Sequence, residues 1–292
     1  MTAAVVPPPG AHGGDGARLA AALGVDPGTI LDLSASLNPV APDPAHVVGK
    51  HLDGLARYPD PAPATAALAD ALGVDPDRVL LTNGGAEAIA LVAAEVGGGV
   101  AAEPEFSLHP RSDDGPRWRS NPNNPTGLLV DGPAGVWDEA FYPLATGRWT
   151  AGHEGAVVVG SLTKVFACPG LRVGYIVADD AARFARRQPH WSVNGLACAA
   201  LPDLLDAADL PGWSRAIAEL RAQLHDLLEP FDPQPSDANW ILCRDAAGLR
   251  DRLAHQRILV RDCTSFGLPD SVRIAVPDDA GLDRLEEALC RV

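Results

Sequence analysis

The sequence predicts an α/β fold in which helices cover both faces of a central, mostly parallel sheet, followed by a smaller α+β unit. The first observation is the order strand, glycine turn and apolar helix at residues 79–96, with further buried strands at 157–161 and 173–177. Strands that alternate with helices form parallel sheets, because the helical crossover returns the chain to the same end of the sheet. The second observation is the mixture of amphipathic helices and short strands after residue 206, which predicts the α+β unit.

Each element is indicated by its own pattern. Apolar residues at helical spacing predict helices, and Gly24 and Gly73 are suited to end the first two because glycine readily adopts the left-handed conformation found after a helix. Short runs of apolar and β-branched residues predict strands. In chain order we expect a helix at 15–23, a strand at 30–34, a helix at 65–72, a strand at 79–82, a helix at 86–96, strands at 157–161 and 173–177, a helix at 213–228, a strand at 240–243, a helix at 246–255, strands at 258–261 and 272–276, and a helix at 282–289.

These elements suggest three parts in the chain of 292 residues. Residues 1–40 are expected to form an N-terminal arm and part of a small domain, with the first dozen residues loose. Residues 41–205 are expected to form the large domain, and residues 206–292 the C-terminal small domain. A chain of this length can bury one large core and a smaller one.

Composition excludes several classes of protein. The net charge of −15 and pI near 4.8 argue against a nucleic-acid-binding surface. The five cysteines form no CxxC pair and no His/Cys ligand spacing, so we expect free thiols in a reducing cytoplasm and no metal site. The N-terminus lacks the regions of a signal peptide, and no apolar run approaches the roughly 20 residues that cross a membrane. We therefore expect a cytoplasmic enzyme with no membrane or nucleic-acid partner.

Lys164 is the most informative single residue. The chain has only two lysines, Lys50 and Lys164, and uses arginine for its other cations. Lys164 follows the predicted strand at 157–161, in the run Ser-Leu-Thr-Lys. An amine can lose its proton and form a Schiff base with an aldehyde, whereas a guanidinium effectively cannot. The pattern favours a covalent partner for Lys164, and pyridoxal phosphate (PLP) is the obvious one.

Three motifs in order carry a resemblance to a known family. They are Asn-Pro-Asn-Asn-Pro-Thr-Gly at 121–127, Asp-Glu-Ala-Phe at 138–141, and the lysine run with its continuation to Tyr175. Together they resemble the fold-type I PLP enzymes of the aminotransferase class I/II. The resemblance implies the fold-type I transferase fold, PLP as cofactor, and a large domain at 41–205 that binds it.

The resemblance also implies roles for individual residues. Lys164 would hold PLP as a Schiff base, Asp138 would pair with the protonated ring nitrogen, and Asn124 would bond the ring oxygen. The catalytic pair would thus be Lys164 and Asp138. The phosphate would be held by Gly85, Ala86, Ser161, Thr163 and Arg172, Phe106 would stack on the ring, and Tyr58 would reach the cofactor phosphate of a second subunit. The last role implies a homodimer with a shared active site.

A closer resemblance extends from about His12 to the C-terminus. His-Gly-Gly-Asp at 12–15, Trp-Ser-Val-Asn at 191–194 and the run at 256–263 are similar to the threonine-phosphate decarboxylases of cobalamin biosynthesis. Histidinol-phosphate aminotransferases share the cofactor motifs but fit these segments less well. In the decarboxylase family the substrate is a phosphorylated amino acid, and the matching substrate-binding positions are His12, Asn38, Asn194, Arg261 and Arg273. Arginines suit this substrate because a guanidinium makes bidentate contacts with phosphate and carboxylate.

Two segments are shorter than the family pattern. The stretches at 107–120 and 128–137 leave too little chain for the usual helix and strands, since a βαβ crossover alone needs about 10–12 residues. We therefore expect a trimmed large domain without peripheral helices, with an edge strand also in doubt. Phe141 occupies the position where aminotransferases commonly have a tyrosine that bonds the ring oxygen. The absence of this phenol slightly favours decarboxylation over transamination.

The sequence leaves three functions open. The first is PLP-dependent decarboxylation of a phosphorylated amino acid, in the manner of threonine-phosphate decarboxylase. The second is transamination of the histidinol-phosphate type, because both reactions use the same cofactor residues and differ in which bond at Cα lies perpendicular to the ring. The third is a trimmed paralogue that binds PLP or a phosphorylated ligand without catalysis.

Overall fold

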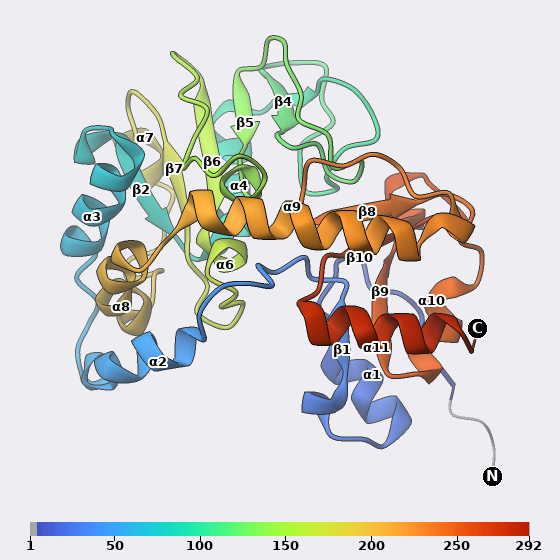
Figure 1. Cartoon of the computed structure of the whole chain (residues 1–292). Coiled ribbons are helices and arrows are strands. Elements are labelled where there is room, and N and C mark those ends of the chain that lie inside the picture. The colour runs from blue at the N-terminus through green and yellow to red at the C-terminus, as the bar shows by residue number, and fades with distance from the viewer. Residues whose placement is uncertain (1–4, 292) are drawn as a thin grey trace.

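The computed structural model describes residues 5–291 and contains two sheets (Figure 1). The larger has six strands in the order β2-β7-β6-β5-β4-β3, and all its strands are parallel except β7, which runs antiparallel to both neighbours. Its strands are β2 (Val79–Thr82), β3 (Gly99–Val100), β4 (Arg117–Ser120), β5 (Val136–Asp138), β6 (Val157–Ser161) and β7 (Gly174–Val177). The α/β fold with a mostly parallel sheet is confirmed.

Helices cover both faces of this sheet. Along β6, Val157 and Val159 belong to one apolar cluster and Val158 to another, because successive side chains of a strand point to opposite faces. The first cluster includes α4 (Gly84–Val96) and Phe184 of α7 (Ala182–Ala185). The second includes residues of α3 (Ala62–Leu72), α5 (Tyr142–Thr146), α6 (Leu162–Val165) and α8 (Gly195–Asp206). Both faces are therefore buried, as the valine run predicts.

The two shortened segments keep their strands and lack helices. No helix forms between residues 101 and 135 in the described chain, which agrees with the predicted loss of peripheral helices. The strands β4 and β5 nevertheless form in these segments and pair in parallel with their neighbours, so the missing parts are the helices. Irregular backbone takes only a few residues to return the chain to the next strand, so the sheet survives without the helix.

The smaller sheet has four strands in the order β1-β9-β10-β8. They are β1 (Leu31–Leu33), β8 (Trp240–Cys243), β9 (Ile258–Asp262) and β10 (Val272–Ala275), with β10 antiparallel to β9 and β8. The N-terminal strand β1 pairs in parallel with β9, so the two ends of the chain share one sheet. The helices around it are α1 (Gly16–Leu23), α10 (Leu249–His255) and α11 (Asp279–Leu289).

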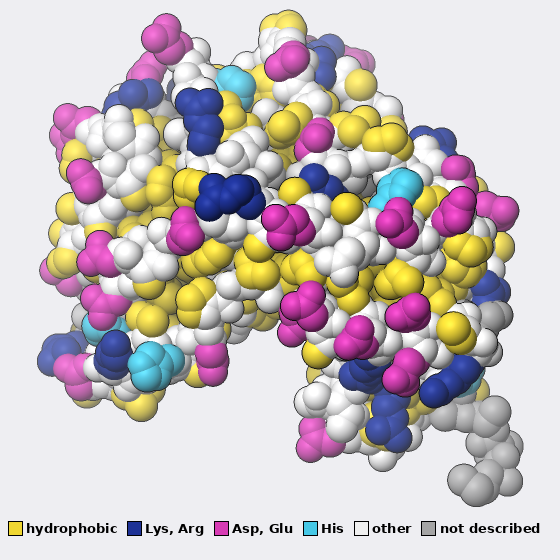
Figure 2. Space-filling model, viewed as in Figure 1, with side chains coloured by type: hydrophobic (Ala, Val, Ile, Leu, Met, Phe, Trp, Pro, Cys, Tyr) yellow, Lys and Arg dark blue, Asp and Glu magenta, His cyan; other side chains and the backbone are white. Residues whose placement is uncertain are grey.

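The long helix α9 (Leu210–Leu227) joins the two sheets (Figure 1). Trp213 and Ile217 pack in the core of the large sheet, and Leu220 and Leu224 pack in the core of the small one. Its side of the molecule in Figure 2 has acidic side chains interspersed with basic ones, and no extended basic surface is visible there. Within the described residues, no helix is both long enough and apolar enough to cross a membrane.

Most predicted elements occur within a few residues of the expected position, while several short elements were missed. The helix α3 begins earlier than expected at Ala62, α4 begins at Gly84 rather than 86, and α10 begins later, at Leu249. Missed elements are α2 (Pro44–Val48), α5, α6, α7 and α8, five 3₁₀ segments (Pro27–Thr29, Gly49–Ala56, Pro76–Arg78, Glu229–Phe231, Thr264–Phe266), and the strands β3, β4 and β5. Helix α8 was missed partly because Pro202 lies inside it, and proline normally ends a helix.

The described part of the N-terminal arm is fastened, contrary to the expectation of a loose segment. Arg250 donates a hydrogen bond to the Pro7 carbonyl, and Arg261 donates to the carbonyls of Gly10 and Ala11. Residues 1–4 lie outside the described residues. Guanidinium groups from α10 and β9 therefore hold the arm against the small-sheet part of the molecule, which sequence periodicity could not reveal because the contacting residues are more than 200 positions apart.

Candidate active site

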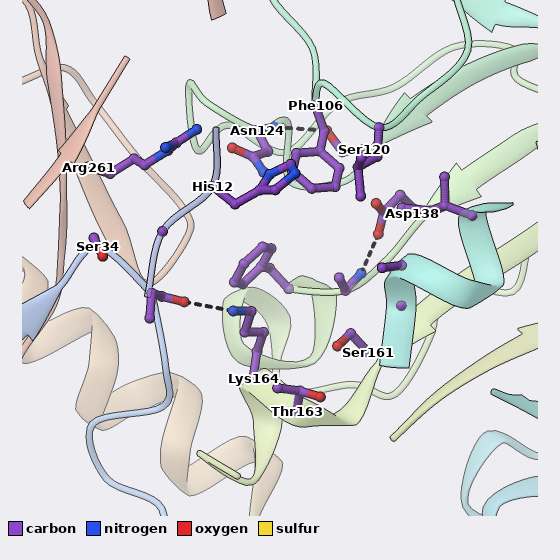
Figure 3. A pocket seen from close by; sticks show the side chains of 18 of the residues that line it. His12, Ser34, Phe106, Ser120, Asn124, Asp138, Ser161, Thr163, Lys164 and Arg261 are labelled. Atoms are coloured by element: carbon purple, nitrogen blue, oxygen red, sulfur yellow. Dashed lines mark hydrogen bonds between the residues drawn. The ribbon is translucent and has the colours of Figure 1, made fainter. Parts of the chain in front are cut away.

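A cavity of about 360 Å³ lies where the two sheets face each other (Figure 3). Its walls include Asp138 from β5 and Lys164 from α6 on one side, and Arg261 and Arg273 from the small sheet on the other. Twelve of the predicted site residues line this cavity: His12, Gly85, Ala86, Phe106, Asn124, Asp138, Ser161, Thr163, Lys164, Arg172, Arg261 and Arg273. The fold thus gathers residues from positions 12 to 273 around one space.

Lys164 points into this cavity from α6, directly after the buried strand β6 (Figure 3). Its Nζ donates a hydrogen bond to the Ala35 carbonyl at 2.9 Å. Burial, together with the nearby cations Arg273 and Arg172 and against an opposing effect of Asp32, lowers the pKa of Lys164 to about 8. A larger fraction of this amine is neutral near pH 7 than of an ordinary lysine, which suits it to attack an aldehyde.

The N-terminus of α4 forms an anion cradle beside Lys164. The side chain of Asn83 does not cap the helix, so first-turn N–H groups remain available to a ligand. Gly84 has φ of +77°, and a Cβ at this position would lie 2.4 Å from Nη2 of Arg172. The guanidinium thus lies in the space that a Cβ would take, and the left-handed φ independently favours glycine at this position. Ser161 and Thr163 line the same cavity, so hydroxyl, guanidinium and backbone donors converge as a phosphate group requires.

Asp138 lies at the end of β5 and is buried. Its Oδ1 accepts from the Ala140 N–H at 3.0 Å, and its Oδ2 lies 3.0 Å from Nε2 of His109. His109 was missed by the sequence analysis because it lies in the shortened segment, which its polar composition suggested was a surface linker. The signal that could have found it was its position three residues after Phe106. In a tight turn this spacing brings the two side chains together, so His109 could have been expected near the same cavity as Phe106.

Asn124 is also buried and is held from two directions. Its backbone N–H donates to Ser120 Oγ at 2.8 Å, and its Oδ1 accepts from Nη1 of Arg273. Ser120 lines the cavity and was not predicted. Phe141, which the sequence analysis singled out, lines the cavity and packs edge-on against Trp240 at 4.6 Å between ring centres.

Arg261 and Arg273 are register partners on the antiparallel strands β9 and β10. Burial lowers the pKa of both guanidinium groups, that of Arg273 to about 10. Arg261 donates to the carbonyls of Gly10 and Ala11 and to Ser265 Oγ. Arg273 lies over the Trp240 ring at 4.7 Å, and its Nε is buried without a partner among the described residues. A buried cation with an unused donor is a site for an anionic ligand.

Three predicted site residues do not line the cavity. Asn38 donates from its amide to the Val165 carbonyl, and its own backbone N–H donates to the Lys164 carbonyl, so it supports the lysine segment from outside. Asn194 caps α8 and donates to the Leu171 carbonyl. Tyr58 is 80% exposed and packs with a tilt of 35° against the exposed Trp191, at 4.8 Å between ring centres. The amides of both asparagines are thus used by backbone carbonyls outside the cavity.

No group of three or more His, Cys, Asp and Glu side chains in residues 5–291 is arranged to hold a metal ion. The described cysteines are free, and burial raises the pKa of Cys168, Cys198 and Cys263 to about 11 and that of Cys243 to about 12. Buried thiols of this kind are poor nucleophiles. None of these cysteines lines the cavity, whose ionisable groups include the amine of Lys164, the carboxylate of Asp138, the imidazole of His12 and the guanidinium groups.

Comparison with known proteins gives a consistent result. The family model described as aminotransferase class I and II matches residues 135–289. The chain is similar to the threonine-phosphate decarboxylase of Salmonella typhimurium, at 32% identity over 354 aligned positions that cover 97% of this chain and 96% of the relative. It is also similar to histidinol-phosphate aminotransferase 1 of Dechloromonas aromatica, at 29% identity with 93% of each chain covered.

A solved structure extends the similarity to the fold. The histidinol-phosphate aminotransferase of Sinorhizobium meliloti, solved in complex with pyridoxal-5'-phosphate, matches with a TM-score of 0.77 at 19% identity, over 94% of this chain and 93% of that one. The alignment of 354 positions with the Salmonella protein exceeds the 292 residues of this chain. The relative therefore has segments that this chain lacks, in agreement with the trimmed large domain.

Proposed function

Because the chain belongs to the aminotransferase class I and II family, we propose that it decarboxylates a phosphorylated amino acid, L-threonine O-3-phosphate, in cobalamin biosynthesis. The chain is an enzyme of the aminotransferase or decarboxylase type, and its cofactor is pyridoxal phosphate. The substrate and the choice of reaction are the proposed part. The observation that carries the proposal is the cavity that joins a buried lysine of lowered pKa to two buried arginines.

The residues present fit PLP. The glycine cradle at the open N-terminus of α4, with Arg172 lying where a Cβ of Gly84 would be, matches the phosphate group. The amine of Lys164 matches the aldehyde, and the carboxylate of Asp138 matches the protonated ring nitrogen. When bound, PLP supplies an electron sink that stabilises negative charge at the Cα of an amino acid.

Each of these side chains has a separate task in the proposed reaction. Lys164 would hold the cofactor covalently and move a proton at the Cα of the substrate, and Asp138 would keep the proton on the ring nitrogen. Gly85, Ala86, Ser161, Thr163 and Arg172 would hold the phosphate of the cofactor, Asn124 would contact its ring oxygen and Phe106 would cover the ring. Phe141 offers no phenol to that ring oxygen.

Arg261 and Arg273 would bind the carboxylate and phosphate of the substrate, with His12 beside them. The unpartnered Nε of Arg273 supports this role. Arg261 is occupied by the arm carbonyls of Gly10 and Ala11, so a dianionic phosphate would compete with neutral carbonyl acceptors. Charge-assisted contacts are roughly twice as strong as neutral ones, which favours the ligand.

Transamination of the histidinol-phosphate type is the second candidate, because the similarity to that enzyme of Dechloromonas aromatica also extends over 93% of this chain. Both reactions would use Lys164 and Asp138 in the same way. A non-catalytic role is less well supported, since a binding protein has no need for a buried lysine whose pKa is lowered to about 8.

We further propose that the enzyme works in the cytoplasm as a homodimer. The exposed Tyr58 lies near other exposed apolar side chains, Leu52 and Leu55, on the same stretch of chain. Large apolar side chains exposed close together in the chain are a feature that an interface with a second subunit would cover. In the dimer Tyr58 would reach the cofactor phosphate of the partner subunit.

The test uses the purified chain with PLP and L-threonine O-3-phosphate. Decarboxylation releases carbon dioxide and an amino-alcohol phosphate while the cofactor stays in its aldehyde form. Transamination of L-histidinol phosphate with 2-oxoglutarate instead converts the cofactor to pyridoxamine phosphate in the first half-reaction. Release of carbon dioxide at a rate of turnovers per second supports the decarboxylase, and conversion to pyridoxamine phosphate without carbon dioxide would replace it by the aminotransferase.

A further inference from the structure

The irregular chain between β3 and β4, which runs into the shortened segment at 107–120, sends two ionisable side chains into the protein. Glu105 is 3% exposed and His109 is 2% exposed. Neither belongs to a strand or a helix, and neither was singled out by the sequence. A carboxylate buried in a loop is costly unless it is hydrogen-bonded, so its partners indicate what it does there.

On one side, Glu105 is connected to Asn124 through Ser120. Glu105 accepts hydrogen bonds from the backbone N–H of Ser120 at 2.9 Å and from Ser120 Oγ. The same Oγ accepts from the backbone N–H of Asn124 at 2.8 Å. The Ser120 hydroxyl therefore donates its proton to the carboxylate of Glu105. This orients the lone pair of Ser120 Oγ that accepts the hydrogen bond from the backbone N–H of Asn124.

On the other side, Glu105 faces Asp138 across the ring of His109. Nε2 of His109 lies 3.0 Å from Asp138 Oδ2, and its Nδ1 lies 3.7 Å from Glu105 Oε1 without a hydrogen bond. A carboxylate can only accept, so His109 donates from Nε2. The ring is clamped between Phe106, edge-on at 5.7 Å, and Trp118 at 5.4 Å. It therefore has little freedom to turn away from Asp138.

We propose that Glu105 is a positioning residue for the pyridine ring of the cofactor. It holds Asp138 in place through His109, and it holds Asn124 in place through Ser120. This inference deepens the proposed function and rests on it. Glu105 lies on neither cavity wall, whereas Asp138 and Asn124 both line the cavity. One buried carboxylate thus connects two cavity-lining side chains, one at the end of β5 and one in the loop after β4, in a part of the chain that forms no helix between residues 101 and 135.

The energetics of burial agree with this role. Burial raises the pKa of Glu105, while the His109 ring and the hydrogen bonds from Ser120 favour its charged form. A glutamine at this position keeps the size and one acceptor but loses the charge that faces His109. The amide of this glutamine must also place an N–H group where the surrounding groups, the N–H and hydroxyl of Ser120 and the N–H of Phe106, are themselves hydrogen-bond donors. Glu105→Gln therefore loosens both connections while leaving the volume of the core unchanged.

The experiment compares Glu105→Gln with Asp113→Asn, which removes one negative charge from an exposed position in the same segment. The readouts are the dissociation constant of PLP, the wavelength and intensity of the absorption band of lysine-bound PLP, and the melting temperature of the cofactor-free protein. We expect Glu105→Gln to weaken PLP binding about tenfold and to shift the band, and Asp113→Asn to change neither. Ser120→Ala, which breaks only the connection to Asn124, should have a smaller effect on affinity.

A double variant tests whether Glu105 acts through His109. Glu105→Gln should weaken PLP binding less in the His109→Asn background than in the parent protein, because contacting residues in one chain of interactions are not additive. If Glu105→Gln lowers the melting temperature but leaves PLP affinity and the band unchanged, Glu105 is only structural and the inference fails. If the parent protein binds PLP in no lysine-bound form, the proposed function fails and this inference fails with it.

Discussion

The two halves of the six-stranded sheet hold cavity-lining residues in place by different means. The half made of β2, β7 and β6 is covered by helices on both faces and carries Lys164 and the glycine cradle. The half made of β5, β4 and β3 has lost its connecting helices, yet it still delivers Asp138 and Asn124 to the cavity. In place of helices it uses irregular backbone fixed by buried polar side chains, chiefly Glu105 and His109.

The comparison indicates which parts of this fold the site needs. Parallel strands bring residues at their carboxyl ends to one edge of the sheet whether or not a helix connects them. The helices supply burial and stiffness, and hydrogen-bonded loops can replace the stiffness locally. We expect the complete half to be rigid and to lose stability when atoms are added to its core. We expect the shortened half to be more mobile and to respond more strongly to changes in the charge of its buried side chains.

The largest effect is expected at the centre of the complete half. Lys164→Ala should lower turnover by about 1000-fold or more, because no second amine lines the cavity among the described residues. The visible absorption band of lysine-bound PLP should disappear. A spectrophotometric titration with PLP checks this, and Lys50→Ala, at the only other lysine, is the control. A band that persists in Lys164→Ala would remove the lysine from its assigned role.

Packing of the glycine cradle should be the next most sensitive feature. A Cβ on Gly174 would lie 2.4 Å from the backbone carbon of Gly84, so Gly174→Ala must push β7 away from the start of α4. We expect a loss of about 1–3 kcal/mol in unfolding free energy, together with weaker PLP binding. Gly170→Ala is the matched control, because a Cβ there meets nothing within 4 Å. Urea unfolding of both variants measures the difference, and equal stability would contradict the close approach.

Hydrogen exchange should separate the halves without any substitution. The strands β7 and β4 each lie second from an edge of the sheet. Amides of β4 should exchange on the order of 10- to 100-fold faster than those of β7, because the chain on either side of β4 has no helix to hold it. Mass spectrometry of the cofactor-free protein provides the measurement. Equal protection would mean that the buried polar side chains stiffen the shortened half as well as helices do.

A smaller, pH-dependent effect is expected at Glu139, which follows β5 and is fully buried. Burial raises its pKa from 4.5 to about 7, and Asp138 adds to the rise, while contacts with Thr150 and Ala151 oppose it. Between pH 4.5 and 7 the folded protein keeps a proton that the unfolded chain has released, so this group makes stability fall as pH rises. Above pH 7 its contribution is constant.

Glu139→Gln should therefore gain stability relative to the parent protein as pH rises from 5 to 8, by about 1–2 kcal/mol. Melting temperatures of both proteins across this range measure the gain. The exposed Glu154→Gln provides the control and should follow the parent at every pH. A constant difference between Glu139→Gln and the parent would show that Glu139 is ionised in the folded protein throughout.

The sequence predicted the complete half better than the shortened one, for a physical reason. Residues 79–96 and 157–177 carry regular apolar periodicity, so the side chains that the sequence pattern predicts to be buried are the ones that the structure buries. In the shortened segments the strands are two to four residues long, and the buried positions are filled by Glu105, His109 and Ser120. Polar residues in a short segment predict a surface loop unless their distant partners are known.

The sequence by itself predicted the α/β fold from its apolar periodicity, and its motifs, through their resemblance to the aminotransferase class I/II family, predicted Lys164, Arg261 and Arg273 as site residues. Only the tertiary structure decided that Asn38 and Asn194 support the backbone instead of lining the cavity, that Arg261 holds the N-terminal arm, and that His109 reaches Asp138. Each of these contacts joins segments far apart in the chain. Their geometry follows from how sheets and loops pack, and no local pattern encodes it.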